Sequence, residues 1–160
     1  MIEIINNSGT FLAYLGVAFA VIFSGIGSSK GVGIVGEAMS GVLVEDPSKF
    51  GQLLLLQALP ATQGIYGFVV GLMVMVTTGM INGTIGALSL GQGAYIFVSC
   101  LPIAVIGMVS GVRQGRVAAA GVNVVAKRPE EVSKAMVAAA MVETYAILAL
   151  LVSLLLIIFM

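Results

Sequence analysis

Two long stretches of this chain carry no charged side chain. There is no Asp, Glu, Lys or Arg from Phe50 to Val112, and none from Ile4 to Ser29. Each stretch is longer than the ~20 apolar residues that an α-helix needs to cross a bilayer. Only 9% of the 160 residues are charged and 59% are hydrophobic, which is too little polar surface to coat a water-soluble domain. The sequence therefore predicts an all-α membrane protein.

Scarce residue types exclude several function classes. The formal net charge is zero and no basic cluster is present, which argues against a nucleic-acid partner. One cysteine and no histidine exclude disulfide frameworks and the common zinc sites, and we interpret Cys100 as an apolar filler. The run Gly31–Gly36 matches a dinucleotide-binding pattern, but it follows no strand, and we attribute it to helix packing. We therefore expect this chain to bind no nucleotide.

Turn-forming residues divide the hydrophobic sequence into four helices. The separators are the charged segment 45–49, the Asn82-Gly83 pair and the charged segment 127–131. The predicted helices are Thr10–Val44, Phe50–Thr78, Leu90–Ala126 and Val132–Met160. They make two tandem transmembrane hairpins, at residues 10–80 and 88–160.

The basic residues indicate how the hairpins are oriented. All of them lie in the two charged turns or on the helices that lead into these turns: Lys30, Lys49, Arg113, Arg116, Lys127, Arg128 and Lys134. Loops rich in Lys and Arg stay on the cytoplasmic side of a membrane. We therefore expect both hairpin turns in the cytoplasm, and both termini and the Asn82 loop outside.

Internal similarity indicates that the two hairpins are diverged copies of one unit. Ser24-Gly25-Ile26 in the first corresponds to Ser110-Gly111-Val112 in the second. Later in each copy, Gln63 aligns with Glu143, so that only the second copy carries an acid at this position.

Small residues recur every fourth position on the first and third predicted helices. They are Gly16, Ala20, Ser24 and Ser28 on the first helix, and Gly107, Gly111, Gly115 and Ala119 on the third. Small side chains let helix backbones approach closely in lipid. We expect these two helices to form the crowded layer, packed against copies of themselves, and the leucine-rich runs Leu53–Leu56 and Leu150–Ile158 to face lipid. A closed ring of hairpins side by side fits this pattern, and a compact four-helix monomer is the alternative.

Glu143 is an acid within the fourth hydrophobic run, with no charged residue between it and Met160. An ionised side chain there costs at least ~2.5 kcal/mol, and acids inside membranes are functional by default. Three polar residues, Gln114, Gln63 and Thr62, share its depth, because all four lie about 15 residues of helix from the nearer turn proline. The sequence thus predicts a polar site at mid-membrane.

The residue types at that depth suit a hard monovalent cation such as Na⁺, which prefers oxygen ligands. Pro60 cannot donate to the carbonyl of Leu56, so we expect it to distort the helix and turn a backbone carbonyl toward the site. One carboxylate and one Na⁺ form a neutral site that can face lipid. In the alternative, Thr62, Gln63 and Gln114 only bond one another between helices.

Three segments resemble the duplicated proteolipid of V-type ATPases, a rotor-ring subunit, and in particular its bacterial sodium-translocating form. They are Leu59–Phe68, Ser110–Gly115 and Met141–Ala146, and the resemblance extends from about residue 11 to 158. It implies that Glu143 carries the ion. It further implies a Na⁺ shell made with Gln114, Gln63, Thr62 and the carbonyl of Leu59, while Tyr66 hydrogen-bonds the carboxylate. We assign supporting roles at the site to Pro60 and Thr144.

The same resemblance implies a set of partners and no active site of the chain's own. Copies of the chain would form a homo-oligomeric ring in lipid, with a central-stalk subunit on the cytoplasmic turns. A stator subunit would supply an arginine that displaces the ion, and other subunits would hydrolyse ATP. We therefore expect a non-catalytic subunit of an ATP-driven rotary ion pump.

One residue departs from the family pattern, and three other functions stay open. Arg113 stands beside Gln114, where relatives have a small or apolar residue, so a fixed cation lies either near the site or on the inner surface of the ring. One alternative is a proton-translocating rotor. A second is a small four-helix cation or multidrug antiporter with aromatic residues around Glu143, for which only Tyr66 and Tyr145 are candidates. A third is a purely structural membrane proteolipid.

Overall fold

The predicted all-α architecture is confirmed by a computed structural model that describes residues 2–160, with side chains from residue 8 onward. Five α-helices follow one another: α1 (Ile2–Glu45), α2 (Phe50–Ala58), α3 (Thr62–Thr77), α4 (Leu90–Lys127) and α5 (Val132–Ile158). Three short 3₁₀ turns lie between them, at Pro47–Lys49, Leu59–Ala61 and Pro129–Glu131. In the described part of the chain, four helical segments are long and apolar enough to cross a membrane, with α2 and α3 counted as one.

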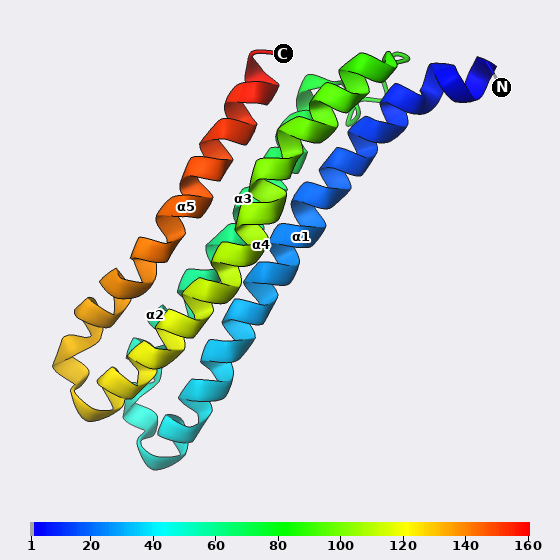
Figure 1. The fold of residues 1–160 in the computed structure, drawn as a ribbon. Coiled ribbons are helices and arrows are strands. Elements are labelled where there is room, and N and C mark those ends of the chain that lie inside the picture. Colours follow the sequence, from blue (N-terminus) through cyan, green and yellow to red (C-terminus); the bar gives the residue numbers. More distant parts are fainter. Residues whose placement is uncertain (1) are drawn as a thin grey trace.

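The helices lie side by side along the length of the molecule, and the turns sort to opposite ends (Figure 1). The two short turns, 46–49 and 128–131, are at one end. Both chain ends and the longer connection between α3 and α4 are at the other end. This arrangement is the one that two tandem hairpins require.

Pro60 breaks the second predicted helix, as its missing N–H led us to expect. The chain passes from α2 through a single 3₁₀ turn, Leu59–Ala61, into α3, without a change of direction that would end the span. The first helix was predicted to begin at Thr10, and this was wrong, because α1 already begins at Ile2. The polar residues before Thr10 therefore continue the helix instead of forming a loop.

The close packing predicted for the two glycine-rich helices is confirmed within one chain, between α1 and α4. A Cβ atom added at Gly27 would collide with the backbone of Met108, and one added at Gly31 with the backbone of Gly111. Ser24, on the same stripe, donates its hydroxyl to the carbonyl of Ile103 at 3.0 Å. Backbone contact of this kind explains why these positions hold small residues.

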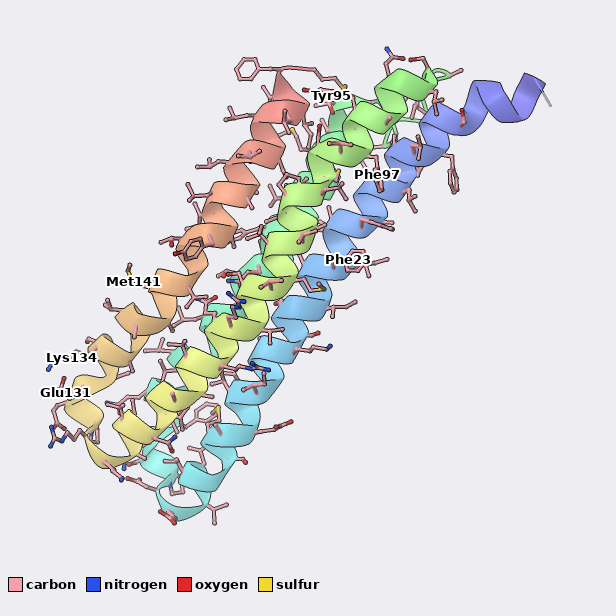
Figure 2. The ribbon with its side chains drawn as sticks, in the orientation of Figure 1. Phe23, Tyr95, Phe97, Glu131, Lys134 and Met141 are labelled. Atoms are coloured by element: carbon pink, nitrogen blue, oxygen red, sulfur yellow. The ribbon has the colours of Figure 1, made fainter. Side chains whose placement is uncertain are left out.

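The outer helices carry most of the exposed apolar surface, with one correction. Met141 on α5 points away from the other helices (Figure 2) and is 63% exposed. The run Leu53–Leu56 was predicted to face lipid as a whole, but Leu53 and Leu56 are fully buried against α1, α4 and α5. The helical period of 3.6 residues makes alternate faces of this run point inward.

The two turns at one end are joined by Lys49. Its ammonium donates to the carbonyl of Ala126 at 2.6 Å, near the end of α4, and lies 3.4 Å from the carboxylate of Asp46. A second ion pair in the other turn joins Lys134 and Glu131 (Figure 2) at 2.6 Å. Cations near the last carbonyls of a helix are favourably placed.

Acid should loosen the first of these turns. Asp46 accepts hydrogen bonds from the amide and hydroxyl of Ser48, and these bonds lower the pKa of its carboxyl, with a smaller contribution from Lys49. Because the folded pKa is depressed, the stabilisation is present above the unfolded pKa and is lost as pH falls through the folded pKa. We expect amide hydrogen exchange at Ser48 to accelerate in that acid range. Asp46→Asn should exchange at a rate that no longer depends on carboxyl ionisation; equal acceleration in both proteins would contradict the assignment.

Candidate ion-binding site

A continuous hydrogen-bonded chain of polar groups crosses three helices at mid-height of the molecule. Glu143 on α5 accepts from the hydroxyl of Tyr66 on α3 at 2.5 Å, and from the side-chain amide of Gln114 on α4 at 3.2 Å. The amide oxygen of Gln114 accepts from Gln63 at 2.5 Å. The convergence inferred from counting residues is therefore seen in space.

The break at Pro60 brings Thr62 and a backbone carbonyl into the same chain. The hydroxyl of Thr62 donates to the carbonyl of Leu59 at 2.9 Å and lies 3.5 Å from the amide oxygen of Gln63. The backbone N–H of Thr62 bonds the same carbonyl, an i to i+3 bond that replaces the usual α-helical one. Pro60 thus produces the local geometry in which Leu59, Thr62 and Gln63 are neighbours.

Burial makes these polar groups depend on one another. Gln63 and Gln114 are both 0% exposed, and Glu143 and Tyr66 are partly covered. A buried amide without partners costs about 1–3 kcal/mol, so the network is stable only when its members are paired. The carboxylate is the only acid in it, and the described residues hold no cluster of three His, Cys, Asp or Glu side chains.

Two serines support the site and were not identified from the sequence. Ser110 accepts from Gln63 at 3.4 Å and donates to the carbonyl of Val142 at 3.1 Å, which links α3, α4 and α5. Ser28 on α1 donates to the carbonyl of Ala61 at 3.1 Å and so holds the 3₁₀ turn. The signal for Ser110 was present, because it lies one helical turn before Gln114 and on nearly the same face.

The two residues assigned supporting roles differ in position. Pro60 is buried, and its ring packs next to Gly31 of α1. Thr144 is exposed, and its hydroxyl donates to the carbonyl of Met141 in its own helix at 2.8 Å. The structure does not bring Thr144 into the network, because one residue of helix turns the side chain about 100° away from that of Glu143.

Arg113 does not join the site. Its side chain is exposed in a groove between α4 and α5, beside Val142 and Tyr145, and no ion pair links it to Glu143. Gln114, the next residue, points to the opposite side and is buried. The arginine therefore leaves the ligand set intact.

The site can offer several oxygens to one cation. The carboxylate of Glu143, the hydroxyl of Thr62, the carbonyl of Leu59 and the amide oxygens of Gln63 and Gln114 lie along one connected path. An amide presents either its oxygen or its nitrogen after a 180° rotation at little steric cost. The glutamines that now satisfy the carboxylate and each other with N–H groups can therefore turn oxygens toward an ion.

The chain matches the family model for the C-type subunit of ATP synthase twice, at residues 15–74 and 97–156. The two matches agree with the internal repeat, and they cover most of both hairpins. The predicted duplication is thus found in the comparison as well as in the sequence.

Two curated proteins are similar over almost the whole chain. The V-type sodium ATPase subunit K of Enterococcus hirae is 48% identical over 154 residues, which cover 96% of this chain and 95% of the relative. The A-type ATP synthase subunit K of Methanocaldococcus jannaschii is 37% identical over 147 residues, which cover 92% of this chain and 62% of the relative.

Proposed function

Since this multi-pass membrane chain belongs to the ATP synthase C family, we propose that it is the rotor-ring subunit of a V-type ATPase and carries Na⁺ across the membrane. The similarity to a subunit named for a sodium ATPase supports this assignment. The observation that carries it is the single acid, Glu143, tied by hydrogen bonds to a set of neutral oxygen donors from α3 and α4.

In this proposal Glu143 binds the ion, and Gln114, Gln63, Thr62 and the carbonyl of Leu59 complete its shell. Tyr66 orients the carboxylate through its hydroxyl. Because Gln63 stands where the second hairpin has its acid, each chain of four membrane spans carries one ion.

Charge neutrality explains how such a site can travel through lipid. Glu143 with bound Na⁺ has no net charge, whereas the bare carboxylate pays the cost of an ion in hydrocarbon. A stator arginine would stabilise the bare carboxylate at the release point, and an aqueous half-channel would reload it. Each charge moved across the membrane is worth about 2.3 kcal/mol per 100 mV, so coupling requires that the unneutralised carboxylate never faces lipid.

The proposed assembly is a closed ring of this chain in the membrane. Both hairpin turns would face the cytoplasm and contact a central-stalk subunit, with both termini outside. ATP would be hydrolysed by other subunits, so the chain acts as a non-catalytic part of the pump.

Labelling of Glu143 by a hydrophobic carbodiimide tests the ion assignment. Na⁺ should slow the labelling, and more strongly at higher pH, because protons and Na⁺ compete for the same carboxylate. K⁺ at equal concentration is the control and should protect less. Labelling that Na⁺ leaves unchanged at every pH would overturn the sodium assignment in favour of a proton-carrying rotor. A Glu143→Gln chain that still supports transport in the assembled pump would favour a structural proteolipid.

A further inference from the structure

A groove between α4 and α5 is the largest described hollow on the surface and holds two arginines. Its volume is about 570 Å³, and Ile106, Val109, Arg113, Arg116, Val142 and Tyr145 are among the residues that line it. Arg113 and Arg116 are both exposed, and neither has an ion pair in the part of the chain that the structure describes. The groove is otherwise apolar, so it presents cations at a depth where water is scarce.

The exposed side of α1 presents a ridge of small residues with one acid in it. Gly25, Ser29, Gly33, Glu37 and Gly41 follow each other at intervals of four residues. A Cβ atom added at Gly25, Gly33 or Gly41 would meet nothing within 4 Å, in contrast to the glycines that face α4. Glu37 is exposed and has no ion pair among the described residues. The ridge is therefore shaped for close contact with another helix that its own chain does not supply.

Glu37 and Arg116 lie at similar heights. The helices α1 and α4 run in the same direction (Figure 1), and Gly31 packs against Gly111 and Gly115. Glu37 is six residues below Gly31 and Arg116 is one residue below Gly115, so their Cα atoms differ in height by about one turn, ~5 Å. Side chains of Glu and Arg can span that difference. In a ring, rotation about the membrane normal changes no atom's depth, so the same match holds between neighbouring copies.

An unpaired charge at this depth is costly. Glu37 lies about 10 residues of helix from Pro47, or ~15 Å, while Glu143 lies at ~21 Å from Pro129. If Glu143 is near mid-membrane, a hydrocarbon core of ~30 Å includes Glu37 and Arg116. Charged residues in such places pair with one another or with a partner. A groove with cations and a ridge with an acid satisfy each other when a second copy supplies one of them.

We propose that the ridge of α1 in one copy seats in the α4–α5 groove of the next, and that Glu37 pairs there with Arg116 of the neighbouring copy. This inference rests on the proposed ring, and it adds the face and the ion pair by which copies join. Arg113 lies about one turn higher in the groove, closer to the level of Gln114, and is further from Glu37. The pair explains why a chain with so few charges keeps an acid and a base inside its hydrophobic spans.

A charge exchange tests the pair. Glu37→Arg and Arg116→Glu should each lower the fraction of intact ring in mild detergent at least ten-fold, measured as mass of the intact complex. The double exchange should restore it to within two-fold of the original chain. Glu45→Arg is the matched control, because Glu45 is an exposed acid on the same helix but at its end, and it should leave the ring intact.

A second variant separates ring contact from folding of the chain. Gly33→Leu should disperse the ring into folded single chains, because the added side chain has open space in one copy and fills the groove between two. Helix content by circular dichroism should be unchanged.

Each other result decides against the pair or against the ring. Intact rings in both single variants would overturn the pair while the ring and the Na⁺ assignment stand. Loss of rings that the double exchange does not restore would also overturn it, and an anionic lipid retained on Arg116 in native mass spectra would then identify the competitor. If the original chain forms no ring, the proposed function fails together with this inference, whereas Na⁺ protection of Glu143 tests the site independently.

Discussion

Glu143→Gln is expected to weaken Na⁺ binding about 100-fold while leaving the fold unchanged. The amide is nearly isosteric with the carboxylate and can still accept from Tyr66 and Gln114, so the packing around α5 has no reason to change. What it lacks is the negative charge that neutralises the ion. Removing one partner of a buried charge pair costs about 2–5 kcal/mol, and each 1.4 kcal/mol is a factor of ten in affinity.

Equilibrium binding of radioactive Na⁺ to the purified assembly measures this loss. Glu45→Gln removes one acid from an exposed helix end, outside the network, and should bind Na⁺ with the original affinity. Circular dichroism and the mass of the assembly should be the same for all three proteins. Retained Na⁺ affinity in the Glu143 variant would show that the neutral oxygens alone hold the ion, and the charge-neutral transport cycle would have to be abandoned.

The fold and the depth of the site could be read from the sequence because a membrane fixes both. Helices must cross it at 1.5 Å per residue, so residue counts from the two turn prolines gave the common level of Gln63, Gln114 and Glu143. The position of α1 against α4 followed from small residues at every fourth position. In each case a strict periodicity ties the sequence to a direction in space.

Features that depend on a side chain's exact direction could not be obtained in this way. Thr144 shares the depth of Glu143 yet points away, and Leu53 and Leu56 turn inward from a run that is apolar on every face. Ser110 donates across to α5 only because α4 and α5 pack closely there. Without an amphipathic pattern, the sequence of a helix in lipid does not say which of its faces is covered.

Gly31→Ala is expected to destabilise the folded chain by about 3 kcal/mol, at the upper end of the cost of overpacking. The added Cβ would lie 2.7 Å from the ring of Pro60 and would collide with the backbone of Gly111. Neither neighbour is a flexible side chain that can move aside. The two helices must separate instead, and because Gly111 lies less than one turn before Gln114, separation also shifts a proposed ligand.

Unfolding in denaturing mixed micelles, followed by circular dichroism of the dispersed chain, measures the loss, and Gly33→Ala is the matched control. Position 33 is on the same helix, two residues further on, and its added Cβ meets nothing within 4 Å. There the higher helix propensity of alanine, worth up to ~1 kcal/mol, is the only effect, so this variant should be at least as stable as the original chain. Equal stability of the two variants would mean that α1 and α4 tolerate a wider separation, and the close backbone contact would not be what selects glycine at position 31.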